Sequence, residues 1–108
     1  MTKNEAMRYA ESIRDDITRL YNESPDMRDE EQDLTAYIFE ALDVEYLLNS
    51  NRELIGVNLF VTLGGPTCWV DTRHGAIECR WGTESGSAWL ASEICDFIND
   101  HFAECLEF

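Results

Sequence analysis

Two histidines are the first side chains to consider for chemistry, because imidazole is the general base most often used near neutral pH. His74 lies in the stretch Arg73-His74-Gly75, and His101 lies among acidic residues near the C-terminus, where a carboxylate can orient it. The sequence offers no nucleophile motif to pair with them, since Ser85-Gly86-Ser87 lacks the spacing of a nucleophile elbow. We therefore expect a protein that is not an enzyme and has no catalytic residues.

Four cysteines, Cys68, Cys79, Cys95 and Cys105, are the other reactive side chains. They form no Cys-x-x-Cys pair, and with the histidines they do not match the spacing of a zinc site. Each lies in an apolar pattern, where free cysteine behaves as a small hydrophobic residue. We expect reduced thiols in the core, no metal and no cofactor. Whether Cys68 lies opposite Cys79 depends on the length of the turn between them, which the sequence leaves open.

Two further patterns favour structural roles. The run Gly64-Gly65-Pro66-Thr67 lacks the lysine and the following helix of a phosphate-binding loop, so it predicts a tight turn. Asp71 and Glu78 on neighbouring strands resemble a carboxylate pair, but Arg73 and Arg80 alternate with them. This alternation predicts cross-strand ion pairs.

Net charge is the strongest signal in the composition. Twenty-two Asp and Glu residues against eight Lys and Arg give a formal charge of −14. This exceeds the magnitude of roughly 2–8 that keeps a small domain soluble. Such a surface repels nucleic acid and anionic membranes and attracts basic proteins. We expect no direct binding to nucleic acid or membrane, and a basic protein as partner.

The most regular acidic pattern lies near the C-terminus. At 100° per residue, its carboxylates occupy an arc of about 80° on a helix, beside an apolar arc. A rise of about 1.5 Å per residue spaces them about 4.5–6 Å apart, comparable to the spacing along a phosphate backbone. No Lys or Arg follows Arg80 to neutralise them. The predicted partner-binding residues here are Glu93, Asp96, Asp100, Glu104 and Glu107.

A second acidic concentration runs from Glu23 to Glu45, with nine carboxylates and the single basic residue Arg28. If the two regions meet in the fold, they form one large negative face. If they do not, the excess acid is a solvated surface that maintains solubility. The predicted partner-binding residues in this region are Asp29, Glu30, Glu31 and Asp33.

The elements that position these residues follow from periodicity. At 108 residues the chain has the size of one domain, residues 1–108. Apolar residues at helical spacing predict helices over 3–22, 30–42 and 91–106, and alternation predicts strands within 44–48, 55–63, 68–70 and 77–81. Residues 82–88 are predicted as a flexible connector. The expected fold is α+β, with two N-terminal helices, a four-stranded antiparallel β-meander and a C-terminal helix packed on the sheet.

Location and the tryptophans complete the expectations. No apolar run approaches the roughly 20 residues that span a bilayer, and the N-terminus lacks the layout of a signal peptide, so we expect a cytoplasmic protein.

Trp69, Trp81 and Trp89 cluster around the meander and the start of the last helix. They are predicted either to fill the core or to anchor a protein interface.

The C-terminal half resembles small proteins of phages and mobile elements through Leu63-Gly64-Gly65-Pro66, Trp69-Val70-Asp71-Thr72, Gly75 and Trp81-Gly82. In size and acidity the chain also resembles anti-CRISPR and antirestriction proteins, whose acidic members imitate nucleic acid. Those families share no motif, so the resemblance transfers no residue roles. It implies a stoichiometric inhibitor that binds the DNA-binding surface of a host defence enzyme, most readily a CRISPR effector, with a restriction enzyme as the other target.

The alternative hypothesis is a non-enzymatic accessory protein that acts through an apolar interface. It would dock or form a homodimer through its sheet and tryptophans, and the acidic residues would serve only solubility. Under this hypothesis, binding depends on aromatic side chains and changes little with salt.

Overall fold

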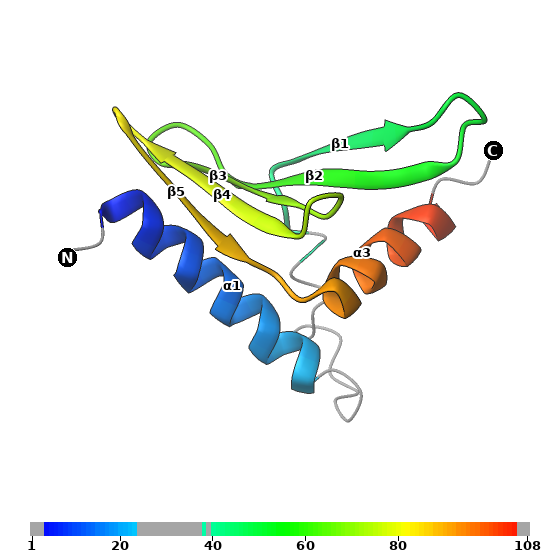
Figure 1. Cartoon of the computed structure of the whole chain (residues 1–108), viewed down its shortest axis with the longest axis horizontal. Coiled ribbons are helices and arrows are strands. Elements are labelled where there is room, and N and C mark those ends of the chain that lie inside the picture. The colour runs from blue at the N-terminus through cyan, green and yellow to red at the C-terminus, as the bar shows by residue number, and fades with distance from the viewer. Residues whose placement is uncertain (1–3, 24–37, 39, 106–108) are drawn as a thin grey trace.

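The computed structural model describes residues 4–23, 38 and 40–105. In this part of the chain, one antiparallel sheet with strand order β1-β2-β3-β4-β5 carries two helices on the same face (Figure 1). The elements are α1 (Glu5–Glu23), β1 (Asp43–Leu48), β2 (Leu54–Thr62), β3 (Thr67–Asp71), β4 (Ala76–Trp81), β5 (Glu84–Trp89) and α3 (Ser92–Cys105). The predicted α+β class and the first and last helices are therefore confirmed.

The sheet has five strands, and the prediction of four was wrong. The missed strand is β5, which lies in the segment predicted as a connector. Its sequence, Glu-Ser-Gly-Ser-Ala-Trp, has no β-branched residue and only Trp89 favours a strand, so the segment gives a weak strand signal. Pairing with β4 in continuous register forms the strand instead, from Trp81 opposite Glu84 to Ala76 opposite Trp89.

Small side chains in β5 allow α1 to pack closely on it. Gly86 and Ala88 face the helix and are buried, and Ala6 and Ala10 on α1 are fully buried. A Cβ atom added at Gly86 would lie 2.8 Å from the carbonyl carbon of Ala6 and still closer to the backbone of Met7. Glycine is therefore required by the contact between the two backbones.

The N-terminal region differs from the prediction in two details. Asn4 caps α1, since its Oδ1 accepts a hydrogen bond from the Met7 N–H at 2.8 Å, so the helix begins at Glu5. The predicted helix over 30–42 lies mostly outside the described residues. Ile38 is helical, but Glu40 is already in a turn, so that helix ends before residue 42.

Alternation along the strands separates a covered face from an uncovered one. Leu59 lies opposite Val70, and Val70 lies opposite Ile77, and all three side chains are buried beneath the helices. α1 covers β4 and β5, and α3 lies over β2 and reaches β1, where Phe102 packs edge-on against Tyr46. None of the described elements covers the opposite face.

The register of β3 and β4 corrects the expectation of four free thiols. Residues 72–75 form the turn, because Asp71 lies opposite Ala76, and this places Cys68 opposite Cys79. The two residues form a disulfide with Cα atoms 4.1 Å apart. Disulfides persist mainly in oxidising compartments, so this pairing does not favour the predicted cytoplasmic location.

Cys95 agrees with the prediction of a reduced core thiol. It is free and buried on the inner side of α3. Burial raises the pKa of its thiol to about 11, and the negative charges of Asp96 and Asp71 act in the same direction. The thiol is therefore neutral at physiological pH and behaves as a core side chain. The side chain of Cys105 lies outside the description.

The close packing of α1 on β5 is testable by substitution at Gly86. We expect Gly86→Val to destabilise the fold by about 3 kcal/mol, because the added atoms meet helix backbone, which cannot move aside. Gly65→Ala is the matched control, since a Cβ atom there meets nothing within 4 Å. Urea denaturation measures both variants, and equal stability of the two would contradict the close contact.

Candidate functional site

The acidic row on α3 is the part of the predicted site that the structure describes. Glu93, Asp96, Asp100 and Glu104 are all exposed. Ile94, Cys95, Ile98 and Phe102 on the same helix are buried against the sheet. The predicted acidic stripe is therefore confirmed for these four residues, while Glu107 lies outside the described residues. The predicted apolar arc consisted of Ile94, Phe97, Ile98, His101 and Cys105, whereas the buried side also includes Cys95 and Phe102.

The α3 carboxylates differ from those of α1 in their partners. On α1, Arg8 lies 3.5 Å from Glu5, Arg14 lies 3.0 Å from Asp15, and Arg19 lies 3.5 Å from Glu23. In the part of the chain that the structure describes, no ion pair involves Glu93, Asp96, Asp100 or Glu104. The negative charge on α3 is therefore uncompensated, while that on α1 is largely paired.

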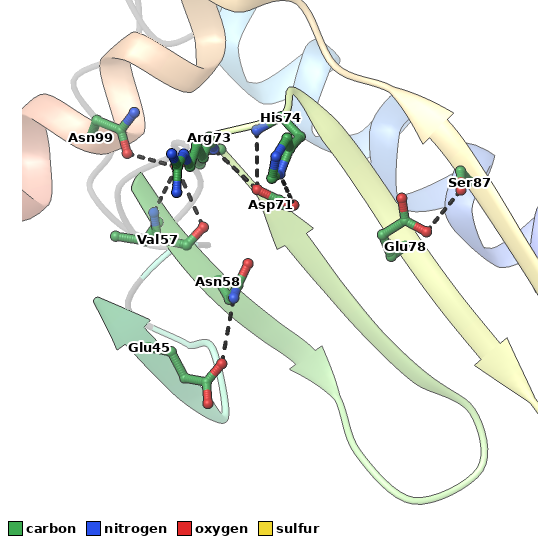
Figure 2. A network of polar contacts seen from close by, with 10 residues as sticks. Glu45, Val57, Asn58, Asp71, Arg73, His74, Glu78, Ser87 and Asn99 are labelled. Carbon is green, nitrogen blue, oxygen red and sulfur yellow. Dashed lines mark hydrogen bonds and ion pairs between the residues drawn. The ribbon is translucent and has the colours of Figure 1, made fainter. Parts of the chain in front are cut away.

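A buried hydroxyl group ties α3 to the sheet. Thr72 Oγ1 accepts a hydrogen bond from the Val57 N–H at 2.8 Å and lies 2.6 Å from Oδ1 of Asn99, to which it donates. The Thr72 N–H also donates to the Val57 carbonyl at 3.1 Å. Figure 2 shows Asn99 of α3 and Val57 of β2 converging on this point. The network fixes the side of α3 that faces the sheet, and hence the side that exposes the carboxylates.

The second predicted acidic region is described only at its ends. Asp29, Glu30, Glu31 and Asp33 lie outside the described residues. Asp43 and Glu45 lie on β1 opposite Phe60 and Asn58, on the uncovered face of the sheet. Since α3 lies on the covered face, these two carboxylates do not extend its acidic row. Asp43 and Glu45 therefore do not form one negative face with the α3 row.

The two histidines have structural contacts. His74 Nδ1 lies 2.7 Å from Asp71 Oδ2, and Asp71 Oδ1 accepts hydrogen bonds from the N–H groups of Arg73 and His74 at 3.1 Å (Figure 2). These bonds close the β3–β4 turn. The His101 ring packs edge-on against Phe102 at 5.4 Å. These contacts give both rings a role in holding the fold.

The predicted ion pairs across β3 and β4 were wrong, because the register places uncharged residues opposite the charged ones. Trp69 lies opposite Glu78, and Thr67 lies opposite Arg80. Glu78 instead accepts a hydrogen bond from Ser87 at 2.8 Å. The Arg80 guanidinium lies 5.6 Å from the centre of the Trp69 ring, which in turn packs against Phe60 at 5.9 Å. A cation–π contact therefore replaces the ion pair.

The three tryptophans have different environments. Trp69 is half-buried, and Trp81 stacks on Tyr9 of α1 with ring centres 5.7 Å apart. Trp89, at the end of β5, is 77% exposed. None of the three is buried, and the core prediction fails for Trp81, which is 39% exposed, and for Trp89. Trp89 is the most exposed of them and is the candidate interface anchor.

The described residues contain neither a metal-binding cluster nor a membrane-spanning helix. Within residues 4–23, 38 and 40–105, no group of three or more His, Cys, Asp or Glu side chains is arranged to hold a metal ion. Neither described helix combines the length and apolar character required to cross a bilayer.

Comparisons with known proteins give no relative. No family model, no curated protein and no solved structure matches the chain. The resemblance to phage proteins and to acidic inhibitors therefore remains a hypothesis, and the site is argued from geometry alone.

Sequence reasoning missed the residues that position the site. Thr72 and Asn99 are separated by 27 positions in the chain, and neither belongs to a recognisable motif. The one available signal was a threonine between the predicted strands within 68–70 and 77–81. Only the register of the sheet shows that this hydroxyl group reaches both β2 and α3.

We expect Thr72→Val to destabilise the fold by about 2 kcal/mol, because it leaves the buried Val57 N–H without its side-chain acceptor. Thr72→Ser keeps the hydroxyl group and should cost less than about 1 kcal/mol. Denaturant unfolding gives both values, and amide exchange of α3 should increase in the valine variant only. Equal stability of the valine and serine variants would show that the hydroxyl network is unimportant.

Proposed function

We propose that the protein is a non-enzymatic inhibitor that binds the positively charged, nucleic-acid-binding surface of another protein through the acidic row of α3. The observation that carries this proposal is the contrast between the two helices. Arginines pair with carboxylates on α1, whereas Glu93, Asp96, Asp100 and Glu104 are exposed without an ion pair among the described residues. A basic surface would supply the missing counter-charges.

The last three carboxylates of the acidic row are unfavourable for the isolated helix, whereas Glu93 in the first turn is favourable. Asp96, Asp100 and Glu104 follow at intervals of four residues, and like charges at this spacing destabilise a helix by a few tenths of a kcal/mol per pair. Glu104 also lies in the last turn, where the negative end of the helix dipole disfavours a carboxylate. A row that opposes helix stability is readily explained by a role in binding.

The dimensions of the row suit a nucleic-acid-binding channel. From Glu93 to Glu104 the helix rises about 16 Å, at about 1.5 Å per residue. Successive carboxylates are about 4.5–6 Å apart along the helix axis, a charge spacing of the same order as the roughly 3.4 Å per phosphate along one DNA strand. Because the helix is fixed to the sheet, the carboxylates are held in place before binding and lose little entropy on association. This supports nucleic-acid mimicry, with a CRISPR effector as the proposed target and a restriction enzyme as the other.

Neutralising the row should separate binding from stability. We expect Asp96→Asn/Asp100→Asn/Glu104→Gln to weaken inhibition at least about tenfold and to stabilise the fold by up to about 1 kcal/mol. The measurement titrates each variant against a panel of purified CRISPR effectors and restriction enzymes bound to labelled DNA, at several salt concentrations. Inhibition by the unmodified chain should fall as salt rises.

The matched control is Glu5→Gln/Asp15→Asn/Glu23→Gln, which removes the same number of charges from ion-paired positions on α1. It should inhibit like the unmodified chain. If both triple variants inhibit equally, or if the unmodified chain displaces DNA from none of the enzymes, the proposal is wrong.

A further inference from the structure

The outer edge of β5 is a second candidate surface for binding. β5 is the last strand of the sheet, and its exposed residues Ser85, Ser87 and Trp89 alternate with the buried residues Gly86 and Ala88. The buried residues face α1, so the side chains of the three exposed residues project on the uncovered face. This strand therefore combines an open edge with an open face.

Hydrogen bonds show which backbone groups point away from the sheet. The Ser85 carbonyl accepts a hydrogen bond from the Asn4 side chain at 3.0 Å, from outside the sheet. In an antiparallel edge strand, every second residue directs its N–H and C=O groups away from the neighbouring strand. The backbone groups of Ser87 and Trp89 therefore point outward, where none of the described residues binds them.

The opposite edge of the sheet is protected, and β5 is not. β1 carries Asp43 and Glu45 and has an irregularity in its pairing between Leu47 and Leu48. Charges and bulges of this kind prevent edge-to-edge pairing. Residues 85–89 contain no charge, proline or bulge. The unprotected edge is therefore a suitable site for an additional strand.

The surroundings of the edge favour arginine on the incoming strand. The Trp89 ring is 77% exposed, and Glu78 lies on β4 opposite Ser87, on the same uncovered face of the sheet. The same sheet face already holds Arg80 over Trp69, at 5.6 Å. An arginine beside Trp89 would make the same kind of contact, on the face that also carries the Glu78 carboxylate.

We propose that β5 binds an extended, arginine-bearing segment of a partner protein as a sixth strand of the sheet. Main-chain hydrogen bonds to Ser87 and Trp89 provide the affinity, and an arginine over the Trp89 ring provides the specificity. The charge of −14 favours a basic segment over a second copy of this chain, which would carry the same charge. The inference concerns a surface other than α3 and does not depend on the proposed inhibition.

The test uses an acetylated and amidated hexapeptide of alternating threonine and arginine as the probe. Its control has proline in place of each threonine, so that the charge is kept and half of the main-chain donors are lost. We expect the threonine–arginine peptide to bind at least about tenfold more tightly than the proline control, as measured by calorimetry. We also expect it to slow amide exchange at Ser87 and Trp89. Equal binding of the two peptides would overturn the proposal.

Variants locate the binding surface. Trp89→Ala should weaken binding about tenfold, and Ser87→Pro should do the same by removing an outward donor from the edge. Ser87→Ala keeps the backbone and should bind as the unmodified chain does. Circular dichroism confirms that each variant is folded, and Trp89→Ala decides the question if Ser87→Pro does not fold.

The α3 triple variant separates this proposal from the proposed function. If that variant loses the peptide and Trp89→Ala does not, the acidic row holds the peptide and the β5 proposal is wrong, while the inhibitor proposal stands. Sedimentation tests for a dimer, and amide exchange shows whether β5 forms it. If the chain dimerises, and if amide exchange at Ser87 slows as the protein concentration rises without peptide, β5 pairs with β5 of a second copy and the proposal is likewise overturned.

Discussion

The close contact between α1 and β5 is the constraint on which the arrangement of the molecule depends. Gly86 lets the backbone of the strand approach the backbone of the helix at Ala6 and Met7, and no larger residue fits there. This contact commits one face of the sheet to the helices. The register of β2, β3 and β4 aligns their core side chains on that same face. α3 covers the part of the face that α1 does not reach.

The same contact explains why the sheet was only partly predictable. The strands containing Val57, Leu59 and Ile77 alternate strongly and bury branched side chains, so their pattern is visible in the sequence. β5 contains small residues because a helix backbone lies against it, and small residues carry no strand propensity. A segment whose conformation is set by a distant helix cannot be recognised from its own sequence.

The candidate site was predictable to a different extent. The exposed row from Glu93 to Glu104 follows from helical geometry alone and was predicted correctly. The Thr72–Asn99 bond, the Cys68–Cys79 disulfide and the outward exposure of Trp89 depend on strand register, which is set by residues far apart in the chain. Exposure that follows from local helical spacing was therefore predictable, and contacts that depend on pairing across the sheet were not.

The two proposed surfaces are adjacent at the junction of β5 and α3. Only Leu90 and Ala91 separate the strand from the helix, and the Leu90 N–H is fixed to the Gly75 carbonyl at 2.8 Å. Trp89 and Glu93 are four positions apart, which limits the distance between their backbones to about 13–14 Å. A basic segment that pairs with β5 and continues past Trp89 would therefore arrive at the first carboxylate of the α3 row. One partner with an extended segment beside a basic surface would be able to occupy both.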